Sequence, residues 1–214
     1  MNVDERMLTY IRSLDRGENE LLQSIKREAL LDHVPIIRNE TASLLKVLLR
    51  MKKPQKLLEI GAAVGFSSIL MSEYAGEQCQ ITTIEKFEPR IVKARENIKR
   101  AGKQQQITLL EGDAMELLKT LKPSFDFIFV DAAKGQYIRF FPEVMRLLEI
   151  NGVLVSDNVL QDGDIVQSRY AVTRRNRTIH SRMREYLWTL THDERLETVV
   201  LPTGDGVTVS TRLN

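Results

Sequence analysis

The chain has 214 residues, of which 43% are apolar and 28% are charged, an ordinary composition for a globular protein with one large domain. A formal net charge of +2 argues against binding of nucleic acid through overall charge, so any polyanion site has to be local. A single cysteine, Cys79, excludes an internal disulfide and a cysteine-based zinc site. Residues 1–16 mix acids with bases and lack a long apolar stretch, which predicts a cytoplasmic protein without a signal peptide or membrane span.

Helical spacing of apolar residues dominates the first part of the chain, and prolines at positions 35 and 54 interrupt it. We expect a helical N-terminal segment over residues 1–53 and a core over residues 56–214, so that residues 1–214 form a single domain. The apolar positions that carry this spacing are Met7, Leu8, Ile11, Leu14, Leu21, Leu22, Ile25, Leu30, Leu44, Leu45, Val47, Leu48 and Leu49.

From residue 56 onward, short apolar runs alternate with helical stretches, the pattern of a parallel sheet built from β-α-β units. Two final runs are joined by Pro202-Thr203-Gly204-Asp205, which predicts an antiparallel pair closing the sheet. The predicted strands are 56–60, 80–85, 107–111, 125–130, 153–156, 196–201 and 206–211. The predicted helices are 66–75, 90–101, 114–121 and about 178–191.

A glycine loop follows the first predicted strand and opens a helix. Its sequence runs Glu59-Ile60-Gly61-Ala62-Ala63-Val64-Gly65-Phe66-Ser67. Small residues at this point let the backbone approach a ligand at the helix N-terminus, which predicts a nucleotide-like cofactor. The spacing Gly-x-x-x-Gly differs from the Gly-x-Gly-x-x-Gly of dinucleotide folds and therefore argues against a pyrophosphate ligand.

Acidic residues end the next two predicted strands. Glu85 can accept hydrogen bonds from both ribose hydroxyls, and Glu111-Gly112-Asp113-Ala114 at the end of the third strand can meet an adenine edge. Alternatively, the glycines only form a tight turn, and Glu85 and Asp113 are solvated charges at strand ends. Three such features at successive strand ends, on the edge where open α/β sheets bind ligands, favour a cofactor site.

Oxygen-bearing side chains also follow two later strands. Asp131 comes directly after FDFIFV, and Asp157 and Asn158 come directly after GVLVS. If these strands are neighbours, three hard oxygen ligands converge, which suits a divalent cation of the magnesium kind. The alternative is that all three are turn or capping residues, because Asp and Asn favour such positions.

These motifs together resemble those of the cation-dependent class I O-methyltransferases related to catechol and caffeoyl-CoA O-methyltransferases. The similarity spans residues 35–212 through EIGAAVGFSS, ITTIE, EGDA, FVDAAKGQY, SDNV and PTGDGV. It implies a Rossmann-like α/β fold: a mostly parallel seven-stranded sheet with an antiparallel C-terminal strand, helices on both faces and extra N-terminal helices. It also implies S-adenosyl-L-methionine as methyl donor, and Mg²⁺ or another divalent cation such as Mn²⁺.

The resemblance further implies roles for particular residues. Lys134 stands three residues after Asp131, as the catalytic lysine does in the catechol enzyme, and its role as base or as electrostatic stabiliser stays open. Ala133 departs from the acidic residue of many plant relatives, so their acceptor preference is not carried over. The implied metal ligands are Asp131, Asp157 and Asn158. The implied cofactor-binding residues are Ile37, Glu59, Gly61, Gly65, Ser67, Glu85, Asp113, Ala114 and Asp131.

A metal at this site can chelate two adjacent acceptor oxygens, lower the pKa of the hydroxyl and direct it at the sulfonium methyl group. Catechols carry such oxygens, and so does 5-hydroxyuridine through O5 and O4. Within the family, DAAKGQY followed by FF, together with SDNVL and a downstream arginine cluster, is most similar to bacterial tRNA 5-hydroxyuridine methyltransferases. The resemblance therefore implies methylation at wobble position 34 to 5-methoxyuridine, with the tRNA anticodon stem-loop as partner.

Six arginines without an intervening acidic residue follow the Asp157-Asn158 pair, and such a patch suits RNA phosphates. A solvated helix face is the structural alternative. Three other functions stay open: methylation of a small catechol-like phenol, an NAD-dependent oxidoreductase, and a non-catalytic RNA-binding domain. Because relatives are commonly dimeric, a homodimer through the leading helices is also expected. The predicted RNA-binding residues are Arg169, Arg174, Arg175, Arg177, Arg182 and Arg184.

Overall fold

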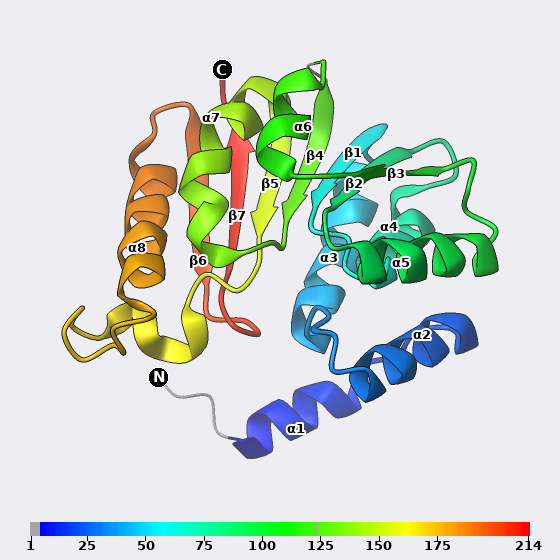
Figure 1. Ribbon diagram of the computed structural model, residues 1–214, viewed down its shortest axis with the longest axis horizontal. Coiled ribbons are helices and arrows are strands. Elements are labelled where there is room, and N and C mark those ends of the chain that lie inside the picture. Colours follow the sequence, from blue (N-terminus) through cyan, green and yellow to red (C-terminus); the bar gives the residue numbers. More distant parts are fainter. Residues whose placement is uncertain (1–4, 123) are drawn as a thin grey trace.

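The computed structural model describes residues 5–122 and 124–214, so residues 1–4 of the predicted helical segment lie outside the described residues. Its centre is a twisted sheet of seven strands in the order β3-β2-β1-β4-β5-β7-β6 (Figure 1). The strands are β1 Lys56–Ile60, β2 Gln80–Glu85, β3 Ile107–Glu111, β4 Phe125–Val130, β5 Leu148–Ser156, β6 Leu196–Leu201 and β7 Val207–Arg212.

The first five strands pair in parallel, and β7 runs antiparallel to both β5 and β6. This confirms the predicted mostly parallel sheet with its antiparallel C-terminal strand. Strand order reverses between β1 and β4, since the chain builds outward from β1 to β3 and then returns to β4. Open α/β sheets bind ligands at the carboxyl ends of strands beside such a reversal.

Helices cover both faces of the sheet, as predicted, and α1, α2 and α3 precede the first strand (Figure 1). The helices are α1 Glu5–Ser13, α2 Glu20–Leu31, α3 Asn39–Lys52, α4 Phe66–Ala75, α5 Glu88–Arg100, α6 Ala114–Thr120, α7 Tyr137–Leu147 and α8 Arg177–His192. Two 3₁₀ segments, η1 Lys134–Gln136 and η2 Gln161–Val166, border the site described below. Within residues 5–122 and 124–214, no helix is both long and apolar enough to cross a membrane.

Side-chain alternation along β4 divides the core into two layers. Phe127 and Phe129 pack with α2, α3 and α4, whereas Ile128 and Val130 pack with α6, α7 and α8. A strand points successive side chains to opposite faces, so a run of continuously apolar residues is buried on both sides. The sheet is therefore enclosed, and only its edges and strand ends are available for function.

Helix α7 was not among the predicted elements. Pro142 lies inside it, and a proline in a helix interior removes a backbone hydrogen bond, so the sequence argues against a helix there. The helix forms because its apolar stripe is buried against the sheet, including the side chains of Tyr137, Phe140 and Val144. Strand β5 likewise begins at Leu148 rather than at the predicted residue 153, with an irregular register beside Phe125.

The ends of β1 and β4 come together at a glycine. Gly61 has φ +107°, and a Cβ added there would lie 2.0 Å from the backbone carbonyl oxygen of Asp131. The Asp131 N–H also donates to the Ile60 carbonyl at 3.0 Å. Only glycine permits this contact, which places the glycine loop directly against the residue that follows β4.

Replacing Gly61 by alanine should therefore destabilise the fold by more than backbone strain alone. Gly102 is the matched control, because it also has positive φ (+65°) and no atom lies within 4 Å of an added Cβ. We expect Gly102→Ala to cost about 1–2 kcal/mol of left-handed strain and Gly61→Ala clearly more, measured by urea unfolding. Equal losses for the two variants would contradict the steric argument.

Candidate functional site

A cavity of about 670 Å³ opens at the carboxyl ends of the central strands. Five predicted cofactor-binding residues line it together: Gly61, Glu85, Asp113, Ala114 and Asp131. Asn158, a predicted metal ligand, lies on the same wall. The cavity is also lined by Pro35, Ile36, Phe87, Arg90, Gln136 and Arg139, which the sequence analysis did not identify. The structure thus joins the predicted cofactor side and the predicted metal side in one space.

The carboxylate of Glu85 fixes the glycine loop to the end of β2. It accepts hydrogen bonds from the backbone N–H groups of Ala63, Lys86 and Phe87, each at 2.9 Å. Ala63 has φ +46°, so these bonds hold the loop in a conformation that non-glycine residues rarely adopt. Asp113, at the next strand end, caps α6 by accepting from the Met115 N–H at 2.9 Å.

The other predicted cofactor residues lie behind the cavity wall. Ile37 is buried in the apolar core, and its neighbours Pro35 and Ile36 line the cavity instead. Gly65 caps α4 with φ +81° and lies close to Ala94 of α5.

Glu59 and Ser67 also lie behind the wall, beneath the glycine loop. Glu59 is fully buried, and its Oε2 accepts a hydrogen bond from the Thr83 hydroxyl. Its second oxygen, Oε1, has no partner among the described residues. Burial raises the pKa of Glu59 to about 7, and the charges of Asp131 and Glu85 act in the same direction. Glu59 in β1 and Ser67 in α4 therefore flank the glycine loop without lining the cavity.

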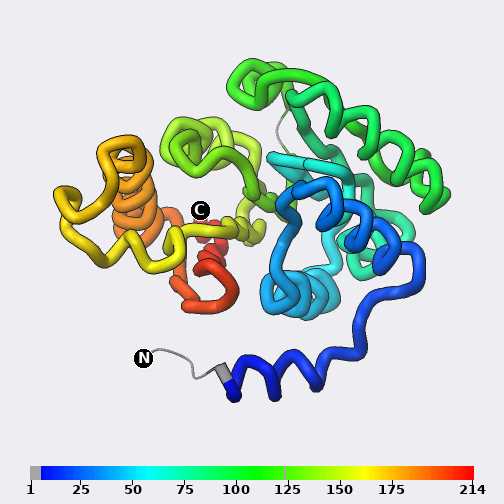
Figure 2. Tube along the Cα trace, turned by 60° about the horizontal axis from the view of Figure 1, so that its bottom comes forward, coloured from blue at the N-terminus to red at the C-terminus, as the bar shows by residue number. Residues whose placement is uncertain are grey.

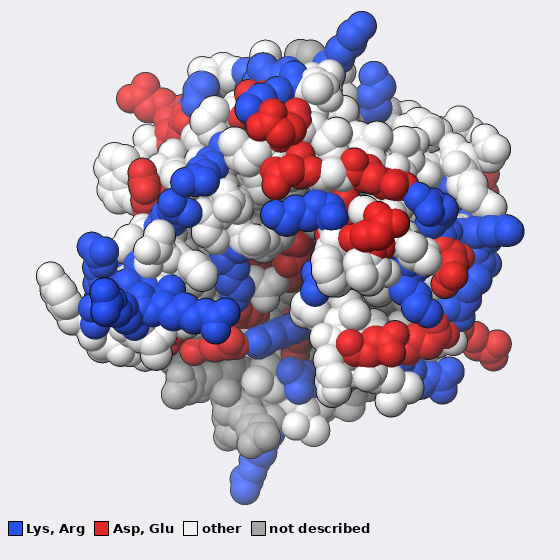
Figure 3. All heavy atoms as spheres, in the orientation of Figure 1, with Lys and Arg blue, Asp and Glu red and all other residues white. Residues whose placement is uncertain are grey.

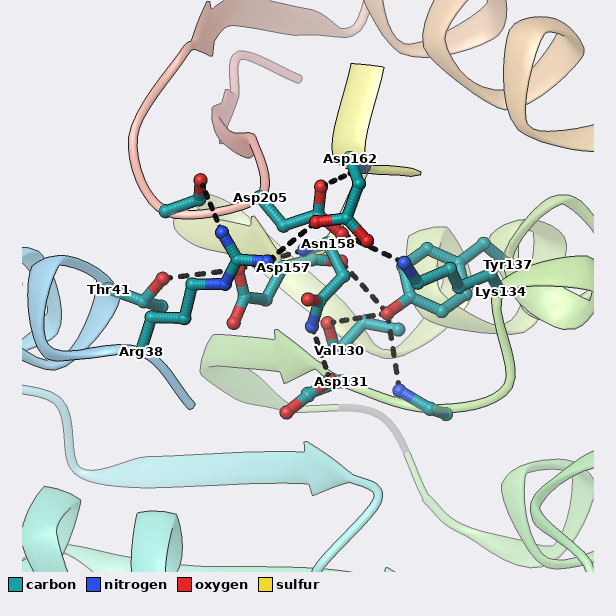
Figure 4. Close-up of polar contacts among 12 residues, drawn as sticks. Arg38, Thr41, Val130, Asp131, Lys134, Tyr137, Asp157, Asn158, Asp162 and Asp205 are labelled. Carbon is teal, nitrogen blue, oxygen red and sulfur yellow. Dashed lines mark hydrogen bonds and ion pairs between the residues drawn. The ribbon is translucent and has the colours of Figure 1, made fainter. Parts of the chain in front are cut away.

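Asp131, Asp157 and Asn158 converge where β4 and β5 end (Figure 4). The Asn158 amide Nδ2 donates to Asp131 Oδ1 at 3.0 Å, and Asp157 Oδ1 accepts from the Asn158 N–H at 2.8 Å. Thr41 of α3 donates its hydroxyl to the same Asp157 oxygen at 3.1 Å. Sequence analysis missed Thr41, because nothing in its helical segment signals contact with a residue 116 positions away.

The carboxylates of Asp131 and Asp157 repel each other; Asp157 is buried, and Asp131 is partly exposed to the cavity. Burial and the charge of Asp157 raise the pKa of Asp131 to about 7, and burial raises the pKa of Asp157 to about 6. Neither carboxylate is in a salt bridge with the described residues. Across residues 5–122 and 124–214, no three His, Cys, Asp or Glu side chains cluster suitably for a metal ion, so this candidate set is two carboxylates and one amide.

The hydroxyl of Tyr137 links the residues that follow β4 and β5. Its ring is buried, and its hydroxyl lies 3.0 Å from the carbonyl oxygen of Asp157 and accepts from the Ala132 N–H at 3.2 Å. Burial raises the pKa of Tyr137 well above its usual value, so the phenol stays a hydrogen-bond donor. Tyr137 ends the FVDAAKGQY motif, which was the available signal for this role.

Lys134 is held by a residue that the sequence analysis assigned only to a turn. Its Nζ lies 2.8 Å from Oδ2 of Asp205, a buried carboxylate in the loop between β6 and β7 (Figure 4). Arg38, at the start of α3, contacts Asp162 at 2.7 Å and the Gly204 carbonyl at 3.1 Å. Asp205 lies in the motif PTGDGV, so the sequence marked this residue but did not indicate that Lys134 is its partner.

The six predicted RNA-binding arginines divide into two groups. Arg177, Arg182 and Arg184 donate to backbone carbonyls, and the acceptor of Arg182 is Gly135, next to Lys134. The other group, Arg169, Arg174 and Arg175, is exposed and forms no hydrogen bond or ion pair with the rest of the described chain. A concentration of basic side chains is visible over α8 and the segment before it (Figure 3).

The fold and the cavity together define the class. The strand order, the antiparallel β7 and the cavity beside the glycine loop are those of a Rossmann-like methyltransferase. The family model for O-methyltransferases matches residues 12–213, and the chain belongs to this family. This membership favours the methyltransferase hypothesis over the oxidoreductase hypothesis.

Individual relatives agree with this assignment. A caffeoyl-CoA O-methyltransferase from Medicago sativa is 31% identical over 176 residues, which cover 79% of this chain and 71% of the relative. A Staphylococcus aureus structure, named provisionally as a caffeoyl-CoA O-methyltransferase, has a TM-score of 0.88 and 30% identity over 95% of this chain and 98% of its own. A methyltransferase from Podospora anserina, solved with bound S-adenosylhomocysteine, has a TM-score of 0.88 and 26% identity, covering 100% and 98% of the two chains.

The buried Glu59 makes a prediction about stability and pH. A carboxyl whose pKa is raised by folding binds its proton more tightly in the folded state. Its contribution is therefore present below its ordinary pKa of 4.5 and is lost as the pH rises to about 7. In the wild type, this loss should lower Tm between pH 5 and pH 8. Glu59→Gln should make that decrease smaller, by an amount that corresponds to at most about 3 kcal/mol of unfolding free energy.

The exposed Glu116→Gln is the control and should leave the wild-type profile unchanged. Asp131 and Asp157 act in the same direction as Glu59, so the slope should be reduced in Glu59→Gln rather than abolished. Parallel Tm curves for wild type and Glu59→Gln would show that Glu59 does not titrate in this range.

Proposed function

We propose that this protein transfers the methyl group of S-adenosyl-L-methionine to a hydroxyl oxygen of its acceptor. The observation that carries the proposal is the shared cavity, in which Gly61 and Glu85 line one part while Asp131 and Asn158 line another. A sulfonium methyl group is already activated, so the task left to the protein is to bring an oxygen nucleophile in line with it. The bound S-adenosylhomocysteine of the Podospora anserina relative supports the choice of cofactor.

The cofactor would lie along the glycine loop. Gly61 lines the cavity there, and Glu85 offers carboxylate oxygens to the ribose hydroxyls. Asp113 and Ala114 line the part of the cavity proposed for the adenine. Gln136 lines the same cavity, and its buried side-chain oxygen has no partner among the described residues.

Asp131, Asp157 and Asn158 would hold a divalent cation such as Mg²⁺ or Mn²⁺. The donor set fits, because a buried carboxylate, Asp157, and a partly buried one, Asp131, have raised pKa values and lack a salt-bridge partner among the described residues. Such a cation supplies chelation of two adjacent acceptor oxygens and a lower pKa for the hydroxyl. Lys134, the first residue of η1, adds a positive charge that acts on Asp131.

For the acceptor, we propose 5-hydroxyuridine at wobble position 34 in the anticodon stem-loop of tRNA. Its O5 and O4 are the adjacent oxygens that the site requires. Arg169, Arg174 and Arg175 support this choice, since three exposed guanidinium groups without partners in the described chain are available to phosphates. Tyr170 is 82% exposed beside them, with the Arg177 guanidinium 5.9 Å from its ring centroid, and it offers a surface for base stacking.

A small catechol-like phenol is the second candidate acceptor. The names of the Medicago sativa and Staphylococcus aureus relatives favour it, because both point to caffeoyl-CoA. A phenol carries the same pair of adjacent oxygens but needs no phosphate contacts. Turnover of a phenol should therefore be insensitive to tRNA competitors and to the exposed arginines.

Mass spectrometry of tRNA nucleosides tests the proposed reaction. Cells without the gene should lose 5-methoxyuridine and accumulate 5-hydroxyuridine. The wild-type gene should restore the modification, whereas Asp157→Ala should not, because the variant lacks a carboxylate of the proposed metal site. An unchanged level of 5-methoxyuridine after deletion of the gene would contradict the tRNA proposal.

Purified Asp157→Ala provides the matching biochemical control. Asp157 does not line the cavity, so the affinity of the variant for S-adenosyl-L-methionine, measured by calorimetry, should stay close to that of the wild type.

Methyl transfer by the wild-type protein should stop in excess chelator and return with Mg²⁺ or Mn²⁺. Full activity in chelator would remove the metal from the proposal.

The exposed arginines make a separate prediction for RNA affinity. Replacing Arg169, Arg174 and Arg175 together by alanine should weaken RNA binding and lower the slope of log K against log salt by about 2–3, roughly one per lost phosphate contact. The control replaces Arg27, Lys99 and Lys122, exposed cations on other parts of the chain, and removes the same charge. A slope equal to that of the control would exclude this patch from RNA binding.

A further inference from the structure

The carboxylate of Asp205 is the most constrained charged group beside the site. Its residue is 4% exposed, and both side-chain oxygens are in use (Figure 4). Oδ2 lies 2.8 Å from Lys134 Nζ, and Oδ1 accepts a hydrogen bond from the Asp162 backbone N–H. A buried carboxylate is costly unless it is paired in this way, so the position of Asp205 and that of Lys134 depend on each other.

The loop that carries Asp205 is itself pinned to the segment after β5. The Leu160 N–H donates to the Asp205 carbonyl at 2.9 Å, and the Val159 N–H donates to the Gly206 carbonyl at 3.0 Å. Gly206 has φ +83°, and a Cβ there would lie 2.2 Å from the Leu160 side chain. Figure 2 shows the loop between β6 and β7 beside this segment, although they are far apart in the sequence.

A second ion pair closes the same assembly from the side of α3. Arg38 bridges Asp162 and the Gly204 carbonyl, so α3, η2 and the β6–β7 loop are tied around Asp205. Gln161 and Asp162 have positive φ values of +54° and +52°, which cost free energy in residues other than glycine. The contacts of Arg38 and Asp205 hold this strained backbone in place.

The side chain of Lys134, in contrast, depends on a single partner for its position. A lysine side chain is a flexible four-carbon stem with a rotatable ammonium group. Its side chain is 32% exposed, and Asp205 is its only hydrogen-bond or ion-pair partner among residues 5–122 and 124–214. Without that partner, the ammonium group is free to turn toward solvent.

We propose that Asp205 is a positioning residue for methyl transfer: its ion pair fixes the ammonium group of Lys134, whose segment contributes Ala133 and Gln136 to the cavity lining. The inference rests on the proposed function and adds a residue to it. Neither Asp205 nor Lys134 lines the cavity, so Asp205 acts on the position of Lys134 and not directly on the cofactor. The ion pair also assigns Lys134 the role of a positive group held in a fixed position.

Asp205→Asn tests the proposal, because an amide retains an oxygen for the Asp162 N–H and loses the charge that holds Lys134. We expect kcat to fall about 10- to 100-fold, the effect of a misplaced group, with the KM for S-adenosyl-L-methionine unchanged. The acceptors are an anticodon stem-loop RNA carrying 5-hydroxyuridine and, separately, catechol. Asp193→Asn, which removes a surface carboxylate paired with Arg195, is the control and should keep wild-type kcat.

A double-mutant cycle separates positioning from a general structural role. In a Lys134→Met background, Asp205→Asn should change kcat by no more than about twofold, because the group it positions is gone. Equal losses in both backgrounds would overturn the inference. An inactive wild-type protein would instead overturn the proposed function and this inference with it, so the two failures are distinguishable.

Competitive acetylation of lysines, read by mass spectrometry, gives a result that does not depend on activity. Lys134 should be acetylated several-fold faster in Asp205→Asn than in the wild type, since the ion pair that shields it is lost. Lys119, paired with Glu116 on the surface, is the internal reference and should not change. An unchanged rate at Lys134 would show that Asp205 does not hold it, even if the kinetic effect were present.

Discussion

The contact between the Gly61 backbone and the Asp131 carbonyl is the constraint on which the site depends. It brings the loop after β1 against the residue after β4, where the strand order reverses. The cavity can therefore hold a ligand on the glycine loop and a second one beside Asp131 within reach of it. Transfer between two bound molecules requires such proximity, and here the absence of a side chain at Gly61 makes it possible.

Segments distant in the sequence complete the acceptor side. Thr41 from α3 orients Asp157, Tyr137 ties the ends of β4 and β5 together, and Asp205 from the last loop holds Lys134. Helix α3 and the C-terminal hairpin therefore contribute to the candidate site as well as to the fold. Their hydrogen bonds supply the rigidity that a preorganised site needs.

Burial of like charges gives the site its electrostatic character. Glu59, Asp131 and Asp157 all have raised pKa values because burial disfavours their charged forms. Lys134 and Asp205 instead form an ion pair with each other. The unpaired carboxylates are the ones that a cation would stabilise, so the charge pattern separates the proposed metal ligands from the group that positions Lys134.

The sequence by itself determined the strands and the chemistry of the strand ends. The bounds of β1 to β4 match the prediction, and Gly61, Glu85, Asp113 and Asp131 share one cavity, because apolar periodicity and strand-end residues are local signals. Helix α7 escaped prediction because tertiary burial outweighs its internal proline. Only the tertiary structure decided that Thr41 and Asp205 belong to the site and that three of the six arginines bind backbone carbonyls. These contacts join residues far apart in the chain, and no local pattern encodes which partner a side chain will meet once the sheet closes.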